Sequence, residues 1–341
     1  MNKYDFTTVF IVPTGIGASI GGFAGDASPY VNLISSICPV ITNPNTVNAA
    51  IFSGLDKNKN ILYTEGFAID SFFKGKTVLR PSKYNKIGII FDKSIPKSVL
   101  NVHINTINAV KSTYGINITD YIITKDEVGV SFSISESGIS TGNIENTQTL
   151  LEAAGNLVEK GIEALAVVCY FELDEDINYL QGNGVDPVGG VEAVISHILT
   201  KEFKIPVAHA PAFSEKELNI STKIVYPGAA AEYITPVYLP CVLFGLYNAP
   251  KLIDINKANY FDITINSIKA LIMPYDCLGG IPALKAIENN IPVLAVEENR
   301  TVLDLTAETL GFKDKIISIK NYLEAAGYVL ALKEGLSGLI N

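Results

Sequence analysis

The pattern that most constrains the fold of this chain is a series of short, continuous apolar runs separated by segments with helical periodicity. Strands that are apolar on both faces are typical of a parallel sheet covered by helices. The runs that predict strands are residues 7–12, 39–42, 87–91, 121–124, 164–170, 270–273, 292–296 and 315–319. The segments that predict helices are residues 98–114, 146–160, 188–199, 282–289, 304–310 and 322–333. The alternation predicts an α/β protein with mostly parallel, Rossmann-like sheets flanked by helices.

Length and composition indicate how this core is divided. The 341 residues correspond to one large α/β domain or to two intimate ones, and we favour two subdomains. Hydrophobic residues make up 48% of the chain and charged residues 18%, a balance that excludes a disordered protein. We place the boundary near residue 140, with an N-terminal α/β subdomain over 1–140 and a C-terminal α/β subdomain over 141–341. No linker-like composition separates them, so we expect them to pack closely.

Charge and cysteine usage restrict the partners and the compartment. The net charge is −9 and no long basic run occurs, which argues against nucleic acid. No apolar run approaches the roughly 18 residues of a membrane span, and the N-terminus lacks a signal-peptide pattern. We therefore expect a cytoplasmic protein with a small-molecule partner and no membrane partner, while a homo-oligomer stays open. The cysteines form no CxxC pair, which predicts reduced thiols at Cys38, Cys169, Cys241 and Cys277.

The stretch TGIGASIGGFAGDASP follows the first predicted strand, and it either contacts a ligand or only turns the chain. Amides in a glycine-rich strand-to-helix loop can converge on an anion. Its spacing is G-x-G-x-x-x-G rather than G-x-G-x-x-G, no acidic residue closes the second strand, and no Gly-Lys-Ser/Thr follows. The sequence therefore specifies no nucleotide, and the cofactor is unknown. The loop residues predicted to line a ligand site are Gly15, Gly17, Gly21, Gly22 and Asp26.

Amide side chains follow the second predicted strand. Asn43, Asn45 and Asn48 lie in TNPNTVNAA, directly after residues 39–42. Open α/β sheets bind ligands outside the carboxyl ends of their strands, so we expect these amides beside the glycine-rich loop. They offer donors and acceptors to a carboxylate or amide substrate, and an Asn-Pro turn is the alternative interpretation.

Two of the three histidines lie within residues 182–213. This stretch holds Asp186, Glu192, His197 and His209. Histidine beside a carboxylate suits acid–base catalysis or metal binding. The spacing matches no metal signature, so we predict no metal site and keep His197 and His209 only as alternative ligands. We prefer His209 as the catalytic group because we place it at the end of an apolar strand.

A further group of polar residues follows two later predicted strands. Cys277 precedes Gly279 and Gly280, where a helix is expected to begin. A thiol ahead of a helix N-terminus is expected to have a lowered pKa, which suits a nucleophile or a general base. A small residue packed at a strand end is the alternative. Glu298 follows the next strand.

The chain resembles a full-length family of unknown function that is best known from phototrophic bacteria. The motifs that carry the resemblance are VPTGIGASIGGFAGDA, TNPNTVNAA, YTEGFAID, GVDPVGGVEAVISH, IPVAHAPAF, AAAEY, LPCVLFGL, CLGGIPAL, VEENRTVLD and NYLEAAGYVLALKEG. They span nearly the whole chain, so the resemblance implies one full-length unit rather than a fusion. It names no catalytic residue.

Together these features favour an intracellular enzyme that acts on a polar substrate carrying a carboxylate or phosphate, as an isomerase, lyase or hydrolase. The predicted catalytic residues are Cys277, His209, Asp186, Glu192 and Glu298. The first two would supply the nucleophile or base, the carboxylates would assist it, and the amides of loops 15–25 and 279–280 would hold the anion. Two alternatives remain: a non-catalytic ligand-binding or regulatory protein that uses the same cleft, and a metal-dependent hydrolase.

Overall fold

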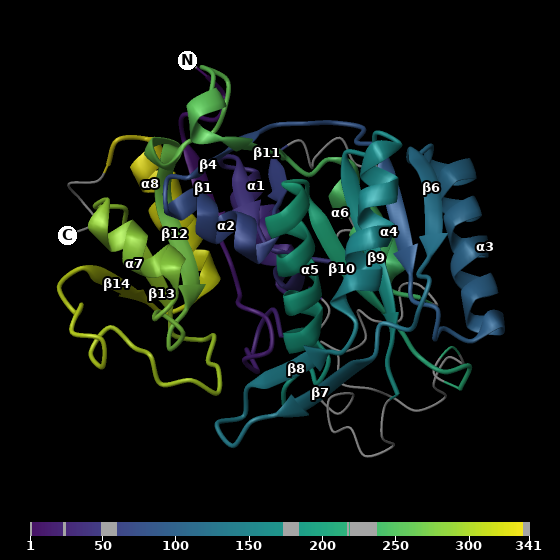
Figure 1. The fold of residues 1–341 in the computed structure, drawn as a ribbon. Coiled ribbons are helices and arrows are strands. Elements are labelled where there is room, and N and C mark those ends of the chain that lie inside the picture. The colour runs from purple at the N-terminus through teal and green to yellow at the C-terminus, as the bar shows by residue number, and fades with distance from the viewer. Residues whose placement is uncertain are drawn as a thin grey trace.

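Two parallel sheets, each covered by helices on both faces, organise the chain (Figure 1). The computed structural model describes residues 2–22, 25–48, 60–172, 184–216, 218 and 237–336. Residues 23 and 24 of the glycine-rich loop lie outside the described residues. The arrangement confirms the predicted fold class, an α/β protein with Rossmann-like parallel sheets.

The first sheet has six parallel strands in the order β14-β13-β12-β1-β2-β3. Their bounds are β1 Thr7–Phe10, β2 Val40–Thr42, β3 Ile61–Tyr63, β12 Ile268–Pro274, β13 Val293–Val296 and β14 Ile316–Ile319. In chain order this is the 3-2-1-4-5-6 sequence of a doubly wound sheet, so the winding reverses between β1 and β12. The predicted glycine-rich loop leaves the carboxyl end of β1 at this reversal point.

Helices cover both faces of the first sheet. One face packs against α1 (Ser28–Ser35) and α8 (Tyr322–Lys333), and the other against α2 (Gly66–Phe73) and α7 (Ile281–Glu288). The start of α8 shows how the sequence sets these boundaries, because the Asn321 side chain accepts a hydrogen bond from the Glu324 amide.

The second sheet has four parallel strands in the order β10-β9-β5-β6. Their bounds are β5 Ile87–Phe91, β6 Ile118–Ile123, β9 Ala164–Tyr170 and β10 Val207–Ala212. The covering helices are α4 (Thr147–Glu159) and α5 (Gly189–Phe203) on one face, and α3 (Lys97–Tyr114) and α6 (Leu239–Tyr247) on the other. In β9 every residue except Tyr170 is buried, which is why its sequence reads as a continuous apolar run.

The two sheets share one hydrophobic cluster, in which side chains of the first sheet pack with those of α3, α6 and the second sheet. Figure 1 shows α5 between the two halves, and α5 packs against α2 of the first and against α4 and β10 of the second. The first sheet takes its strands from residues 7–63 and 268–319, and the second from 87–123 and 164–212. The subdomain boundary near residue 140 stays a prediction.

Two small sheets complete the structure. The antiparallel pair of β4 (Thr77–Arg80) and β11 (Lys251–Asp254) lies beside the first sheet, and the hairpin of β7 (Val130–Ile134) and β8 (Ser140–Ile144) contacts α5. In the described part of the chain, short 3-10 helices span Pro44–Thr46, Ile255–Lys257 and Ile265–Ser267. Among the described residues, no helix is long and apolar enough to cross a membrane.

The predicted helix at 304–310 is wrong, since Leu305 forms a β-bridge with Cys277 and residues 307–310 form turns. Thr306 and Thr309 explain the difference, because each accepts a hydrogen bond from the other's backbone amide through its hydroxyl. Such local side-chain bonds compete with helical backbone bonding. Leu305 instead donates its amide to the Asp276 carbonyl, which ties the segment to the loop after β12.

Candidate functional site

The glycine-rich loop after β1 uses several of its own amides to hold its shape. The Ser19, Ile20 and Gly21 amides donate to the Arg300 carbonyl, Asn299 Oδ1 and Asp26 Oδ1, at 2.8, 3.0 and 2.5 Å. Because protein groups occupy these three donors, they are not directed at a ligand. The loop as a ligand-binding element stays a prediction, and these contacts favour its structural interpretation.

The other glycines of the loop allow close packing. Gly15 and Gly17 both have positive φ, at 73° and 58°. A Cβ on Gly15 would lie 3.1 Å from Ser140 Cβ, and one on Gly22 would lie 2.2 Å from the Ala18 carbonyl oxygen. The Ser140 amide also donates to the Gly15 carbonyl. The loop therefore joins the first sheet to the β7–β8 hairpin that contacts α5.

The asparagines predicted beside this loop do lie there, and two of them bind its backbone. Asn43 pairs with Val12 in both directions: Oδ1 accepts from the Val12 amide at 3.2 Å, and Nδ2 donates to the Val12 carbonyl at 2.8 Å. Asn45 donates to the Gly21 carbonyl at 2.8 Å. The Asn48 amide donates to Ser28 Oγ at 2.9 Å. These contacts anchor the turn between β1 and α1.

The loop after β12 contains the predicted thiol, and the pKa of this thiol is shifted in the direction opposite to the expected one. Cys277 is buried, and burial followed by the charge of Asp276 raises its pKa above the ordinary value. The lowered pKa expected from the nearby helix N-terminus is therefore wrong, because desolvation of the thiolate dominates. Its Sγ donates to the Pro274 carbonyl at 3.6 Å. Gly279 packs against Leu305, and Gly280 is the N-cap of α7.

Glu298, the carboxylate after β13, is exposed, and its Oε1 accepts a hydrogen bond from the Tyr322 amide at 2.8 Å. This contact lies at the start of α8, a helix that covers the first sheet. Glu298 therefore helps to cap α8. It does not contact the histidines.

Three predicted site residues come together where α5 packs against the second sheet: Asp186, Glu192 and His209. His209 is the third residue of β10 rather than a residue after the strand, and its ring faces α5. Glu192 lies in the first turn of α5. His209 Nδ1 and Glu192 Oε1 are 2.7 Å apart, and the two side chains are 1% and 17% exposed. This pair is the centre of the candidate site.

The start of α5 positions Glu192. Asp186 Oδ1 accepts hydrogen bonds from the Val188 and Gly189 amides, and Ser140 Oγ accepts one from Gly190. Gly190 permits a very close approach, since a Cβ there would lie 2.3 Å from the Ser140 carbonyl oxygen. The first amides of α5 are thus held by Asp186 and by the β7–β8 hairpin.

The partners of His209 define its protonation. Nε2 accepts a hydrogen bond from the Cys169 amide at 3.2 Å, so this nitrogen carries no proton. Nδ1 must then carry the proton and donate it to Glu192. Burial lowers the pKa of His209 to about 3, against a smaller opposing effect of Asp92. The imidazole is therefore neutral at pH 7, and both of its nitrogens have protein partners.

Burial also keeps protons on the carboxyls. It raises the pKa of Glu192 to about 8, and burial followed by the charge of Glu192 raises the pKa of Asp186 to about 7. A protonated carboxyl still accepts a hydrogen bond through its carbonyl oxygen, so Glu192 Oε1 can receive the His209 proton while Oε2 carries its own. The described residues contain no hydrogen-bond partner for Glu192 Oε2.

His197 lies apart from this pair, although it is on the same helix. Its Nε2 is 2.9 Å from Oε1 of Glu65, the N-cap of α2. Burial lowers the pKa of His197, but the hydrogen bond and charge of Glu65, with Asp70, raise it above the ordinary value. The two histidines therefore do not share a set of ligands. In the described part of the chain, no group of three or more His, Cys, Asp or Glu residues could hold a metal ion.

Three further residues of the site region were not predicted. Asp92 follows β5, and its carboxylate accepts from the Ser94, Val128 and Tyr170 amides. Tyr63 ends β3, and Ser140 begins β8. A polar residue directly after an apolar run was the available signal for Asp92. Tyr63 and Ser140 depend on how the two sheets pack together.

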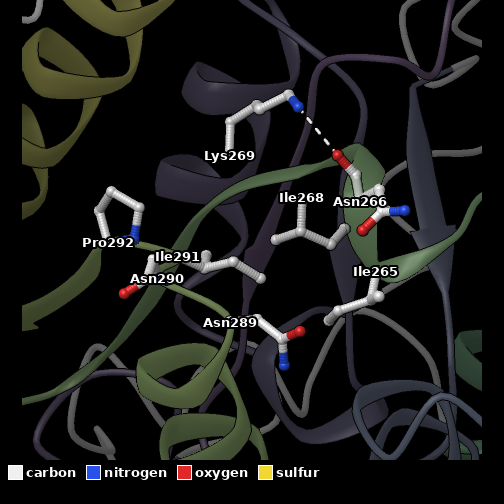
Figure 2. A pocket seen from close by; sticks show the side chains of 8 residues that line it. All are labelled: Ile265, Asn266, Ile268, Lys269, Asn289, Asn290, Ile291 and Pro292. Atoms are coloured by element: carbon white, nitrogen blue, oxygen red, sulfur yellow. Dashed lines mark hydrogen bonds between the residues drawn. The ribbon is translucent and has the colours of Figure 1, made fainter.

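A surface pocket of about 300 Å³ lies elsewhere (Figure 2). It is lined by Asn266, Lys269, Asn289 and Asn290 together with apolar side chains at the amino ends of β12 and β13. Lys269 Nζ donates to the Asn266 carbonyl across it. The pocket is at the edge of the first sheet opposite the loops discussed above, and it contains no carboxylate or histidine.

The fold and the site together define a class: an α/β protein with two parallel sheets and a buried carboxyl–histidine cluster beside the second. The chain belongs to the DUF3326 family of proteins of unknown function, whose model matches residues 7–339. It is 39% identical over 338 residues to an uncharacterized lipoprotein of the cyanobacterium Synechococcus sp., covering 97% of this chain and 92% of that protein. No solved structure matches the chain. The resemblance to a full-length family of unknown function is thereby confirmed.

Proposed function

We propose that this protein is an enzyme that transfers a proton to or from a small polar substrate, with Glu192 as the acid–base group and His209 as the residue that positions it. The observation that carries the proposal is the 2.7 Å hydrogen bond between the buried His209 ring and a carboxyl whose other oxygen has no described protein partner. A carboxyl group with a pKa near the working pH can both donate and accept a proton.

The direction of each contact supports this division of roles. His209 cannot present a nitrogen to a substrate, because Glu192 and the Cys169 amide occupy Nδ1 and Nε2. Glu192 retains one oxygen for a substrate, and its side chain is 17% exposed. The acid–base role first assigned to either residue therefore falls to Glu192. Asp186, held by two amides at the start of α5, keeps this helix end in place.

The reaction class remains isomerase, lyase or hydrolase, and the substrate a small polar acid. Cys277 as the nucleophile receives no support from its burial or its raised pKa. The second candidate function is binding of the same ligand without chemistry. The site would then hold a ligand oxygen through Glu192 and leave every bond of the ligand intact.

Solvent proton exchange distinguishes the two functions. The purified chain is incubated in D2O with a mixture of small carboxylic and phosphorylated acids, and products and deuterium incorporation are read by mass spectrometry. The enzyme should incorporate deuterium or convert one compound, and E192Q should lose that activity because a carboxamide cannot act as a general acid or base near neutral pH. The exposed Glu152 on α4 provides the control, E152Q, which should retain activity. No exchange or conversion by the wild-type chain would contradict catalysis.

We also propose that the protein works in a reducing compartment, in the cytoplasm. All four cysteines are free thiols, and three of them are buried. The name of the Synechococcus relative describes that protein as a lipoprotein. Fractionation of cells that express the native chain tests the proposal, since recovery in the membrane pellet would contradict it.

A further inference from the structure

Tyr63, at the end of β3, lies among the elements that build the candidate site. Its ring packs against α6, where Gly245 leaves room for it, since a Cβ on Gly245 would lie 2.6 Å from Tyr63 Cε1. Helix α6 packs against β10, the strand of His209. Two residues after Tyr63, Glu65 caps α2, which packs against α5, the helix of Glu192. Tyr63 thus packs against the helix that supports the His209 strand, and it lies two residues before the helix that supports α5.

No described residue gives the Tyr63 hydroxyl a hydrogen-bond partner that would explain its burial. The residue is only 6% exposed, yet its oxygen makes no hydrogen bond to any described residue. The polar atoms that are fully enclosed and unpartnered in the described chain belong to Thr42, His103 and Thr200, so the Tyr63 oxygen still reaches accessible space. Buried hydroxyls are normally hydrogen-bonded, and exceptions require an explanation.

Glu192 and Tyr63 are electrostatically coupled. Burial, then the charges of Cys241 and Glu192, raise the pKa of Tyr63. Its phenol is therefore neutral and can donate a hydrogen bond. Glu192 Oε2 likewise has no hydrogen-bond partner among the described residues. Both groups are O–H donors at pH 7, and neither contributes a negative charge.

We infer that Tyr63 is a second ligand-contacting residue of the same site, and that the ligand is a small oxygen-rich acid whose carbonyl or carboxylate oxygens accept hydrogen bonds from Tyr63 Oη and Glu192 Oε2. This inference rests on the proposed function, because it assumes that Glu192 is protonated and faces the ligand. Two neutral O–H donors favour an oxygen acceptor, and they stabilise negative charge that develops on a carbonyl oxygen during proton transfer.

The test uses the full chain with 3-fluorotyrosine at position 63 and the probes acetate, pyruvate, oxalate and inorganic phosphate. We expect saturable 19F shifts with the carboxylate probes, with pyruvate or oxalate binding more tightly than acetate because each offers more acceptor oxygens. Response to phosphate alone would overturn the assignment to carbonyl and carboxylate oxygens. No saturable response to any probe would overturn the inference.

Variants separate a binding role from a structural one. Y63F should bind the carboxylate probes about tenfold more weakly, as expected for one hydrogen bond to a charged group, and should unfold at the same denaturant concentration as the wild type. The matched control is Y328F, which removes a partly buried phenol from α8, a helix that covers the first sheet. Equal probe affinity of Y63F and wild type would overturn the inference.

Failure of the proposed function and failure of the Tyr63 inference give different experimental results. If Glu192 titrates as an ordinary carboxyl, the proposed function fails and the inference fails with it. If Glu192 is protonated at pH 7 but Tyr63 senses no probe, only the role of Tyr63 is overturned.

Discussion

His209 Nδ1 and Glu192 Oε1 lie 2.7 Å apart, and neither side chain is charged at pH 7. A histidine–carboxylate contact on a protein surface would be an ion pair, but burial disfavours both charged forms here. The Cys169 amide fixes the histidine tautomer, so the proton shared by the pair belongs to the imidazole. Glu192 is left with a proton of its own.

The three histidines should titrate separately. Burial lowers the pKa of His103, Glu65 raises that of His197, and His209 has a pKa of about 3. In 1H–13C spectra of the histidine Cε1–H groups, the His197 signal should therefore titrate with a midpoint above pH 6.5 and the His103 signal with a midpoint below it. The His209 signal should move only near the acid limit of the fold. Assignment by H103Q, H197Q and H209Q identifies each signal. A His209 signal that moves near pH 6.5 would contradict the account of the site.

Stability should fall as pH rises from 6.5 to 8. The folded pKa of Glu192 (about 8) and of Asp186 (about 7) exceed the ordinary values of 4.5 and 3.8, so the folded state holds more protons in this window. Each group then lowers the free energy of unfolding by up to about 1.4 kcal/mol per pH unit. His209, whose pKa is lowered from 6.5, acts in the opposite direction only below pH 6.5.

Urea unfolding of wild type and E192Q across this window measures the effect. E192Q removes one titrating group and should give the shallower decline, while E152Q should follow the wild type. Equal slopes for wild type and E192Q would show that Glu192 is ionised in the folded protein.

Replacing Gly190 by Ala should separate α5 from the β7–β8 hairpin. The added Cβ would lie 2.3 Å from the Ser140 carbonyl oxygen, which is backbone and cannot rotate away. We expect a loss of about 1–3 kcal/mol in the free energy of unfolding, together with weaker function at Glu192. The control G155A, inside α4, meets no atom closer than 4.0 Å and should stabilise by about 0.5–1 kcal/mol. A neutral G190A would contradict the close contact.

The thiols should react in an order set by burial. Cys38, Cys169 and Cys277 are buried, and burial raises the pKa of each, whereas Cys241 is partly exposed. Mass spectrometry after brief alkylation of the native chain should therefore find Cys241 labelled first. Rapid labelling of Cys277 would instead support the activated thiol expected from its place before α7.

The sequence was sufficient for those parts of the fold that depend on local pattern. The run at 164–170 is β9 without change of bounds, and the segment 322–333 is α8. Asp186 and Glu192 were considered together with His209 because all three lie in the stretch 182–213. They meet in the structure because a helix that follows one parallel strand packs beside the next. Strand β3 has only three residues and gives no clear periodicity, so the sequence did not reveal Tyr63.

The features of the site that the sequence did not predict depend on packing and desolvation. The contacts of Tyr63 require knowledge of how the first sheet meets α6. The position of Cys277 before a helix suggested a lowered pKa, but the surrounding side chains exclude water and reverse the shift. The asparagines after β2 were placed at the correct edge, yet Asn43 and Asn45 bind loop backbone, which composition cannot distinguish from binding a substrate.

The most direct test of the account is the titration of the Glu192 carboxyl carbon, followed by 13C NMR in protein labelled at glutamate Cδ and assigned with E192Q. This signal should move with a midpoint near pH 8, as a protonated carboxyl held by neutral His209 requires. A midpoint near 4.5, the ordinary value for glutamate, would contradict it.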